Sequence, residues 1–342
     1  MADMQVLVLM GGPDGEREVS IQSGKRVAAA LREAGGFEVH EQIIDRPTLE
    51  EIRAMPGDAI FPVLHGPWGE GGELQELLEV DGRPYVGSRP RAARAAMDKA
   101  TSKLFARAAG IRTPPARVLR AGDSCDLPLP LVVKPLADGS SLEVHRCFDE
   151  DQLNAARARF DAAGQPALVE RLVQGREITA GILERDVLPL IEIVTTQPFY
   201  DFAAKYERDD TQYQLDPALP DAVRDEIVHA ARTIYEQLGC RDVARADFMV
   251  DADGAWFLEI NSMPGMTDHS LVPKAAAHAG IAFSEMCKRL VERSVVRLRS
   301  SRRHGRSGSR ASAATAVSGS EGAPSNDGDG GSVAMETPDG AE

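Results

Sequence analysis

Four polar residues occur at alternating positions in two apolar segments of the C-terminal third. Arg245 and Asp247 lie in RADFMV, and Glu259 and Asn261 lie in WFLEIN. The DADG between them, residues 251–254, is typical of a tight turn. Because strand side chains alternate between the two faces of a sheet, each pair shares one face. If the two faces coincide, two carboxylates, an amide oxygen and a guanidinium come together on one hairpin.

Such a polar cluster is costly to bury unless something pairs with it. Carboxylate and amide oxygens at this density suit Mg²⁺, which usually takes one or two carboxylates plus substrate phosphates. The alternative, which the hairpin alone leaves open, is a structural Arg–Asp ion pair. The loop NSMPGMT, residues 261–267, favours a ligand site, because its small residues let a backbone approach a ligand closely.

Composition excludes several classes of function. The chain has 342 residues, 43% hydrophobic and 27% charged, which is enough for two or three globular domains. A net charge of -14 argues against a general nucleic-acid or acidic-membrane surface, so an anionic substrate needs a local cationic pocket. No signal peptide or membrane-spanning run is expected. The four cysteines are widely spaced and predict free thiols in a reducing, cytoplasmic compartment.

The N-terminal part is expected to begin with an α/β unit. Residues 5–10 form a predicted strand, GGPDG follows, and a helix begins at Glu16. A helix N-terminus favours an anion. Residues 58–64 form a second predicted strand that leads into His65 and a glycine-rich loop. Ligands of open α/β sheets bind at such strand ends, although a structural histidine is the alternative.

The central part carries a basic helix over residues 91–110 and several strands. The strand over 128–135 contains Lys134 and precedes LADGSS, which suits a phosphate because it offers backbone N–H and hydroxyl donors. An ordinary surface lysine is the alternative. Two further strands carry Glu170 and Glu177, which could hold an adenine and a ribose or could be solvated edge charges.

The remaining segments complete the predicted order. Residues 188–194 form a strand, and residues 198–220 lack periodicity and are long for a connector, which predicts an active-site lid. A helix covers residues 221–238, and a closing helix runs from 284 to about 296. From Arg297 the chain is first basic and then rich in Ala, Ser and Gly, so a disordered tail is expected.

Nine motifs in this order resemble one known family. They are MGGPDGEREVSIQSG, FPVLHGPWGEGG, PYVGS, MDKATSK, LPLVVKPLADGSS, LVERLVQGREIT, FYDFAAKY, RADFMV and EINSMPGMTDHSLVPKAA. The chain resembles the D-alanine–D-alanine ligases of the ATP-grasp superfamily, from about residue 6 to about residue 296.

The resemblance implies an α/β protein with an α+β central region. In this ATP-grasp fold, an N-terminal Rossmann-like domain precedes two α+β subdomains that hold the nucleotide between them. The expected limits are 1–98 for the substrate-binding N-terminal domain and 99–183 for the central subdomain. The C-terminal subdomain with the magnesium site spans 184–296, and the tail spans 297–342.

The implied activity joins two molecules of D-alanine at the expense of ATP, through a D-alanyl phosphate, and makes the D-Ala-D-Ala dipeptide for peptidoglycan. Polyphosphate charge must be neutralised, the oxyanion stabilised and water excluded. The resemblance implies two Mg²⁺ ions, which Mn²⁺ could replace, and a homodimer. It implies neither a nucleic-acid nor a membrane partner.

The resemblance also assigns nucleotide and metal residues. Asp247, Glu259 and Asn261 match the metal ligands. The phosphate-binding lysines are Lys99, Lys134 and Lys205. The adenosine contacts are Glu170 and Glu177, with Arg171, Leu172 and Val173 as the linker beside the adenine.

The remaining assignments concern the two D-alanines. Glu16 matches the residue that takes the ammonium of the first and belongs, with Ser140 and Tyr206, to a trio that pins the lid. His65 lies against the substrate carboxylate, and Arg245 and the N–H of Gly265 form the oxyanion hole. Ser270 and Leu271 hold the second substrate, with the Ser270 hydroxyl on its carboxylate. Tyr206, where relatives that use D-lactate carry Phe, predicts an amine as second substrate.

Two departures from the family pattern leave alternatives open. Leu142-Glu143 replaces Val-Gly after the Gly-Ser-Ser loop, and Gly71 replaces Asp. We expect a carboxylate at Glu143 to repel the triphosphate and loosen loop closure, unless it points outward. The altered loops would permit another D-amino acid or small amine as substrate. An inactive nucleotide-binding homologue is disfavoured, because a chain without catalysis has no reason to keep a costly buried charged cluster.

Overall fold

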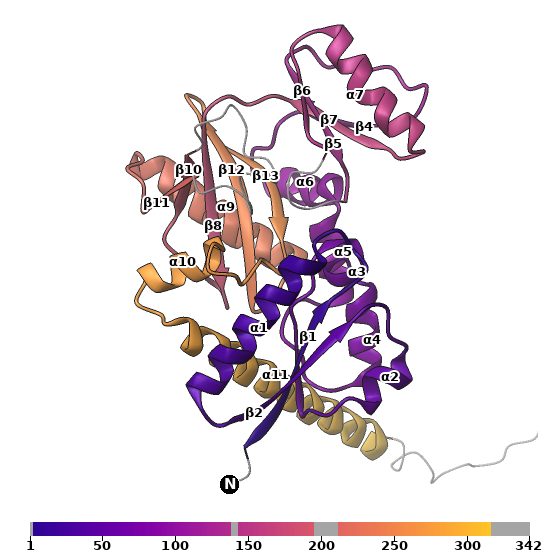
Figure 1. The fold of residues 1–342 in the computed structure, drawn as a ribbon, viewed down its shortest axis with the longest axis vertical. Helices are drawn as coiled ribbons and strands as arrows, with labels where there is room; N and C mark the ends of the chain where they lie inside the picture. Colours follow the sequence, from indigo (N-terminus) through magenta and orange to yellow (C-terminus); the bar gives the residue numbers. More distant parts are fainter. Residues whose placement is uncertain (1–2, 138–142, 195–210, 316–342) are drawn as a thin grey trace, which may run out of the picture. The chain divides into compact units, whose positions relative to one another are not determined.

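The computed structural model describes residues 3–137, 143–194 and 211–315, with side chains up to residue 300 (Figure 1). The described residues up to Leu298 belong to one compact unit built around three sheets. Among the described residues, no helix is both long and apolar enough to cross a membrane. All four cysteines lie in the described part and are free thiols, as predicted.

The first sheet is parallel, with the order β2-β1-β3. Its strands are β1 (Met4–Gly11), β2 (Phe37–Ile44) and β3 (Ala59–Pro62), and the accompanying helices are α1 (Arg17–Ala34), α2 (Leu49–Ala54), α3 (Gly66–Glu70), α4 (Glu73–Asp81) and α5 (Pro90–Met97). Strand β1 is buried on both faces, since Val8 and Leu9 belong to different hydrophobic clusters. Both β1 and β3 were predicted, whereas β2 was not, because FEVHEQII is largely exposed and polar.

The predicted basic helix is two helices. Helix α5 ends and α6 (Lys99–Ala108) begins at Asp98, whose extended backbone breaks the helix. Its carboxylate accepts a hydrogen bond from the backbone N–H of Thr101 at 2.6 Å, as an N-cap should.

The second sheet is antiparallel, with the order β4-β7-β5-β6. Its strands are β4 (Ala116–Leu119), β5 (Leu131–Pro135), β6 (His145–Cys147) and β7 (Ala167–Arg171). Helix α7 (Glu150–Ala162) packs on this sheet through an apolar stripe that includes Leu153 and Phe160. Asp149 caps its N-terminus by accepting from the N–H of Gln152 at 2.8 Å.

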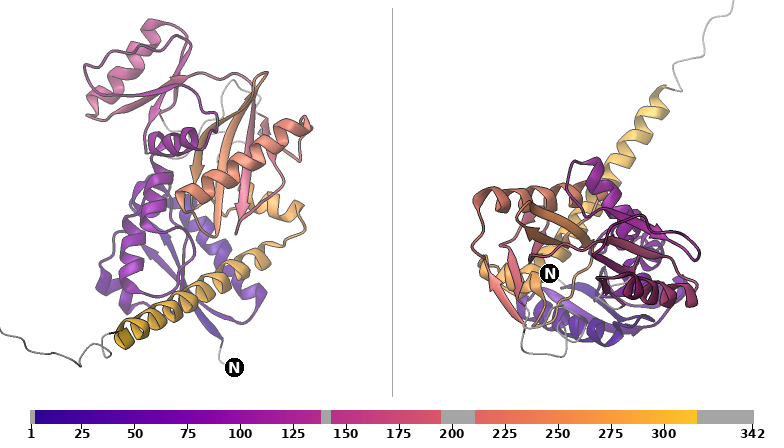
Figure 2. Two further views of the ribbon diagram at one scale, coloured as in Figure 1. Left: turned by 180° about the vertical axis from the view of Figure 1, so that it is seen from behind. Right: turned by 90° about the horizontal axis from the view of Figure 1, so that it is seen from above.

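The third sheet is antiparallel and has the order β11-β10-β8-β12-β13, with β9 paired to β8. Its strands are β8 (Arg176–Leu183), β9 (Asp186–Val187), β10 (Ile191–Val194), β11 (Gln212–Leu215), β12 (Val243–Asp251) and β13 (Gly254–Asn261). Helix α9 (Asp221–Leu238) lies across one face of this sheet (Figure 2). Its residues Ile227 and Ile234 share a core with Ala246, Phe248 and Phe257, which leaves the other face of β12 and β13 for polar residues.

The predicted domain limits stay predictions. In the sheet pairing, the change from the second sheet to the third falls between β7 and β8, so β8 belongs to the sheet that carries the hairpin.

Helix α10 (Leu271–His278) is followed by α11 (Phe283–Thr315). The prediction of disorder from Arg297 is therefore wrong for residues 297–315, which are helical; residues 316–342 lie outside the described part. A helix that is already nucleated extends at little cost, so apolar periodicity is not required for its continuation. Arg297 itself bonds to Asp242 at 2.9 Å and to the Tyr85 carbonyl at 2.9 Å.

Candidate active site

The polar residues of the β12–β13 hairpin share one face, as predicted. In the strand register, Arg245 lies directly opposite Asn261, and Asp247 lies directly opposite Glu259. Residues that face each other across an antiparallel pair project to the same side. The guanidinium, the two carboxylates and the amide therefore occupy the face of the hairpin that α9 does not cover.

A β-bulge in β13 sets this arrangement. Asp247 pairs with Glu259 and the next residue, Phe248, pairs with Phe257, so Leu258 is an extra residue. Strict alternation would put Phe257 and Glu259 on the same face. With the extra residue, Phe257 is fully buried in the core beneath α9 while Glu259 projects to the polar face.

Asp247 is held from two sides. Its carboxylate accepts hydrogen bonds from Arg245 Nε at 3.0 Å and Nη2 at 3.0 Å, and from the Thr179 hydroxyl at 2.6 Å. Thr179 faces Asp247 across β8 and β12. The structural ion pair that the sequence left open thus exists here, and it fixes the orientation of both partners. Thr179 was not predicted, because its role depends on the pairing of β8 with β12.

The donor set on this face fits Mg²⁺. Two carboxylates lie opposite each other, and the amide oxygen of Asn261 accepts from the Met263 N–H at 2.9 Å, which orients it. Within the described residues no three His, Cys, Asp or Glu side chains gather as a metal site. A set of two carboxylates and one amide suits an ion that completes its coordination with phosphate and water.

Buried lysines border this face. Lys99 Nζ lies 3.5 Å from Glu259, and Lys134 Nζ lies 2.5 Å from Glu170. Burial disfavours the charged form of Lys134, but the combined attraction of Glu170, Glu259 and Glu177 outweighs burial and raises the pKa of Lys134. Both predicted phosphate-binding lysines in the described region therefore lie beside the acidic groups. Lys103 was missed, although its position four residues after Lys99 places it on the same side of α6.

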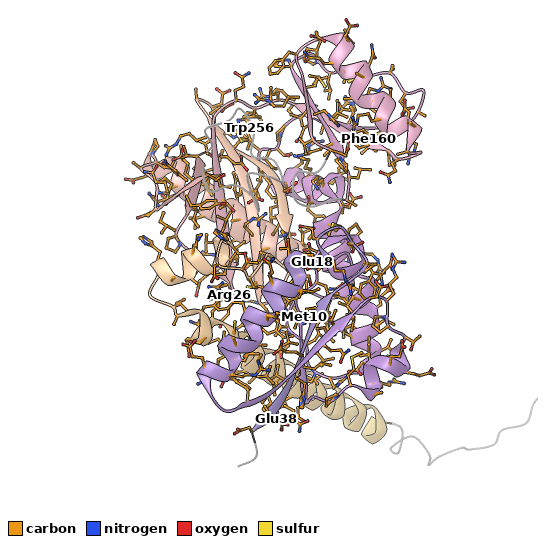
Figure 3. The ribbon with its side chains drawn as sticks, in the orientation of Figure 1. Met10, Glu18, Arg26, Glu38, Phe160 and Trp256 are labelled. Carbon is orange, nitrogen blue, oxygen red and sulfur yellow. The ribbon has the colours of Figure 1, made fainter. Side chains whose placement is uncertain are left out.

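The predicted adenosine segment follows β7. Leu172 donates its backbone N–H to the Pro130 carbonyl at 3.0 Å, and Val173 is buried. Trp256 lies at the turn end of the hairpin (Figure 3). The Arg171 guanidinium stacks on its ring, 4.2 Å from the centroid. Glu177 lies on the same face of β8 as Thr179, by alternation, and therefore borders the polar face.

The N-terminal residues Glu16 and His65 are both buried. Glu16 precedes α1, and His65 precedes α3. Burial lowers the pKa of His65, so the neutral imidazole predominates near neutral pH, and the nearby Glu16 opposes this only in part. Among the described residues, the buried Nε2 of His65 has no hydrogen-bond partner. An orphaned buried nitrogen of this kind fits a site that a ligand completes.

Glu70 is a further buried acid that the sequence did not single out. One of its oxygens accepts from the Gly66 N–H at 3.3 Å. Burial, and secondly the carboxylate of Glu16, raise the pKa of Glu70 well above its ordinary range. Glu70 therefore helps to fix the turn that carries His65. Its carboxyl group is neutral at pH values below its raised pKa.

Replacement of Glu70 by glutamine tests this assignment. In the unfolded chain Glu70 has its ordinary pKa, and in the folded protein its pKa is raised. The folded state therefore loses stability as the pH rises from the ordinary pKa to the raised one. Glutamine stays neutral and can still accept from the Gly66 N–H. We therefore expect Glu70→Gln to be more stable than wild type at pH 8, by about 1 kcal/mol or more, and to lose most of this advantage at pH 5. Thermal unfolding at both pH values measures it; an advantage that does not change with pH would contradict the assignment.

Residues 262–270 form the loop after the hairpin, and hydrogen bonds join this loop to α1. Arg26 donates to the carbonyls of Met266 and Thr267 at 2.9 and 2.8 Å, and it is another residue that the sequence did not reveal (Figure 3). Ser270 precedes α10, and its hydroxyl oxygen accepts from the Thr267 N–H at 2.9 Å. A Cβ at Gly265 would lie 2.9 Å from that same hydroxyl oxygen, so glycine is needed for this packing. Leu271 is buried at the start of α10.

Three predicted site residues, Ser140, Lys205 and Tyr206, lie outside the described residues. The predicted lid over residues 198–220 is described only from residue 211, where β11 occupies part of it.

Glu143 does not face a triphosphate as an unpaired charge. Its carboxylate bonds to Arg159 Nε and Nη2 at 3.0 and 2.8 Å and to His145 at 3.0 Å. These partners lower the pKa of Glu143. The carboxylate is therefore paired and exposed rather than bare, and its effect on loop closure stays a prediction. The backbone of Glu143 has a φ of 54°, a conformation that favours glycine.

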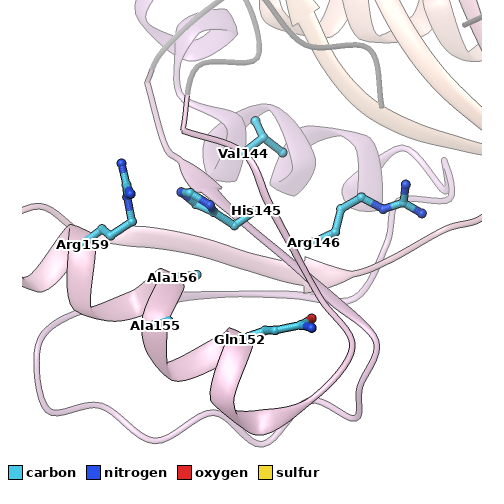
Figure 4. Close-up of a pocket in the computed structure, with 7 residues that line it drawn as sticks. All are labelled: Val144, His145, Arg146, Gln152, Ala155, Ala156 and Arg159. Carbon is cyan, nitrogen blue, oxygen red and sulfur yellow. The ribbon is translucent and has the colours of Figure 1, made fainter. Parts of the chain in front are cut away.

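A pocket of about 520 Å³ lies beside this ion pair, between β6 and α7 (Figure 4). It contains none of the predicted site residues and is not the active-site cleft. Its lining residues are Val144, His145, Arg146, Gln152, Ala155, Ala156 and Arg159.

Gly71, the other departure, is required by local packing. A Cβ at this position would lie 2.1 Å from the carbonyl oxygen of Pro67. Aspartate therefore cannot occupy position 71 in this conformation, and the turn after His65 is shaped by glycine. Asp14 supports the same turn by accepting from the Trp68 N–H at 2.9 Å.

Comparison with known proteins gives a consistent result. Residues 40–88 match the family model for the D-Ala-D-Ala ligase N-terminus, and residues 114–292 match the model for its C-terminus. The chain is 40% identical over 295 residues to the D-alanine–D-alanine ligase of Citrifermentans bemidjiense, covering 84% of this chain and 95% of that protein. It is 42% identical over 303 residues to the ligase of Stutzerimonas stutzeri, covering 85% and 94%.

Solved structures agree with the sequence comparison. The D-alanine–D-alanine ligase of Bacillus anthracis complexed with ATP matches with a TM-score of 0.77 at 31% identity, over 88% of this chain and all of that one. The VanG D-Ala:D-Ser ligase of Enterococcus faecalis matches with a TM-score of 0.74 at 26% identity, over 86% of this chain. The fold is the predicted ATP-grasp fold, and the chain belongs to the D-alanine–D-alanine ligase family.

Proposed function

We propose that this protein is an ATP-dependent ligase that joins two molecules of D-alanine and supplies the dipeptide for peptidoglycan. The observation that carries the proposal is the shared face of β12 and β13. It holds Arg245, Asp247, Glu259 and Asn261 together, with Lys99 3.5 Å from Glu259. Relatives that bear this activity in their names align with most of the chain, and one of them was solved with ATP.

The first half-reaction transfers the γ-phosphoryl group of ATP to the carboxylate of the first D-alanine. Lys99 and Lys134, joined by Lys205, neutralise the polyphosphate, and Glu177 with residues 171–173 holds the adenosine. Asp247, Glu259 and Asn261 would hold magnesium, two ions by the resemblance. When bound, the metal supplies charge neutralisation and alignment of the phosphates. Glu16 receives the substrate ammonium, and His65 lies against the substrate carboxylate.

The second half-reaction is attack by the amine of the second D-alanine on the acyl phosphate, with loss of phosphate. Arg245 and the Gly265 N–H stabilise the oxyanion of the tetrahedral intermediate. The ion pair with Asp247 holds the guanidinium in place before the charge develops. Ser270 and Leu271 bind the second substrate at the start of α10. Ser140, Tyr206 and Glu16 close the site and exclude water, which would hydrolyse the acyl phosphate.

Phosphate release tests the proposal. We expect release with ATP, Mg²⁺ and D-alanine, much weaker release with D-lactate at neutral pH, and loss of activity with excess chelator that added Mg²⁺ or Mn²⁺ restores. A panel of D-amino acids that includes D-serine identifies the second substrate. Equal or faster turnover with another D-amino acid, or ester formation with D-lactate at the same rate, would show that D-alanine is not the preferred second substrate. Nucleotide binding without turnover on any substrate would identify an inactive homologue.

The cellular setting is part of the proposal. Four free cysteines suit the cytoplasm, where D-alanine and ATP are available. A homodimer without a nucleic-acid or membrane partner, and domain limits at residues 98, 183 and 296, remain predictions from the resemblance.

A further inference from the structure

Three buried charged residues meet behind the nucleotide site from three different elements. They are Lys103 on α6, Lys134 on β5 and Glu170 on β7, and each is at most 6% exposed. Lys103 Nζ lies 2.8 Å from one oxygen of Glu170, and Lys134 Nζ lies 2.5 Å from the other. One carboxylate thus bridges two ammonium groups away from water.

The two lysines are not equivalent. Lys103 Nζ also donates to the Thr113 hydroxyl at 2.9 Å and to the Phe257 carbonyl at 3.4 Å. Lys103 Nζ therefore has two hydrogen bonds and one ion pair, all to groups of the protein. Contact with one Glu170 oxygen leaves Lys134 with donors for a phosphate. Lys103 therefore contacts protein groups, whereas Lys134 has donors with which to contact a ligand.

The charges of the trio explain why a second lysine is present. Glu170 and Lys134 alone would form a neutral pair, and the lysine charge would be cancelled toward a nucleotide. A buried carboxylate shared between two lysines leaves a net positive charge, and it also holds the Lys134 side chain in one orientation. Both oxygens of Glu170 lie within ion-pair distance of a lysine.

We propose that Lys103 is a positioning residue for ATP binding, which acts as the counter-ion of Glu170 so that Glu170 can orient Lys134 without cancelling its charge. The proposal rests on the proposed function in one respect, that the ligand at Lys134 is a nucleoside triphosphate.

The ionisation of the trio agrees with this geometry. Burial lowers the pKa of Lys103 to about 8, and Glu170 opposes this in part, so Lys103 is charged at neutral pH. Burial would raise the pKa of Glu170, but Lys103 and Lys134 together hold it below its ordinary value. The acid Glu259 on β13 is also near both lysines, and Glu177 on β8 is near Lys134.

Four variants of the full chain test the proposal. Lys103→Met removes the counter-ion and keeps the bulk, Lys103→Arg keeps the charge, and Lys103→Met combined with Glu170→Gln removes the buried carboxylate as well. Lys25→Met, at an exposed lysine of α1, is the control. The measurements are the Kd of ATP without D-alanine, the KM values of both substrates, and thermal unfolding.

We expect Lys103→Met to weaken ATP binding about tenfold, the effect of one lost charged contact, while the KM for D-alanine changes less than about twofold. The double variant should bind ATP more tightly than Lys103→Met, because Lys134 is no longer neutralised. Lys103→Arg should recover part of the loss. Lys25→Met should match wild type in every measurement.

Three results would overturn the proposal. One is an unchanged Kd for ATP in Lys103→Met together with a lower melting temperature, which would make Lys103 a purely structural residue. Another is equal ATP affinity in Lys103→Met and the double variant. The third, which applies if Lys103→Met does not fold, is a folded double variant that binds ATP no more weakly than wild type. ATP binding is measured without turnover, so failure of the proposed ligase reaction would leave this test intact.

Discussion

Replacement of Arg245 by lysine should lower kcat at least about 100-fold, the usual cost of losing one oxyanion donor, and change the KM for ATP less than about threefold. Lysine keeps the positive charge but is a single flexible donor group, whereas the guanidinium presents a rigid fork. In the structure this fork spans both oxygens of Asp247, through Nε and Nη2. Lysine cannot hold Asp247 and an oxyanion at once with the same geometry.

Replacement of Arg245 by alanine should abolish turnover, but it is the less specific experiment. It leaves Asp247 with Thr179 as its described partner, and an underpaired carboxylate with little exposure costs roughly 1–3 kcal/mol of stability. The lysine variant keeps a positive charge beside Asp247, so a fall in its kcat reports the lost oxyanion donor rather than a loss of stability.

Arg176→Lys is a matched control for the Arg245 experiment. Arg176 forms a comparable two-bond pair with Glu192 in the same sheet, at 2.8 and 2.6 Å, on the face opposite to the site. It should lose some stability and keep its kcat. Near wild-type kcat in Arg245→Lys, or an equal fall in Arg176→Lys, would exclude the oxyanion assignment.

Replacement of Lys134 by methionine should raise the KM for ATP about 100-fold, because a buried ammonium that contacts phosphate is lost where the dielectric is low. The cost in stability should be small. Glu170 keeps Lys103 at 2.8 Å, so its charge remains paired. The KM for ATP and for D-alanine, measured separately, together with thermal unfolding, distinguish these effects.

The expected order of the two lysine variants is a further check on the same site. Lys134→Met should weaken ATP binding more than Lys103→Met, because Lys134 contacts the phosphate and Lys103 acts through Glu170. The reverse order, or a change in the KM for D-alanine alone, would show that the phosphate lies elsewhere.

Local patterns in the sequence were enough to predict the centre of the site. Alternation placed Arg245 with Asp247, and Glu259 with Asn261, and the DADG turn brought the two strands together. The nucleotide segments and the family followed from motifs. These features depend on residues that are neighbours along the chain, which is why they can be read from one sequence.

Features that depend on contacts between distant segments were not predictable. Thr179 reaches Asp247 only because β8 pairs with β12, and Lys103 reaches Glu170 only because α6 packs near β7. The exposed strand β2 lacks an apolar pattern, and α11 continues past Arg297 without one. For Thr179, Lys103 and β2 the partner, rather than the local sequence, decides the outcome, whereas α11 continues because a nucleated helix extends at little cost.

The extra residue Leu258 separates two requirements within a single strand. On the turn side of it, Phe257 packs into the core beneath α9; on the other side, Glu259 and Asn261 project to the polar face while Ile260 packs into the core. The length of the strand is therefore constrained, because loss of one residue would turn Glu259 toward the core and Ile260 toward the site. Among homologues, this strand should thus keep its length.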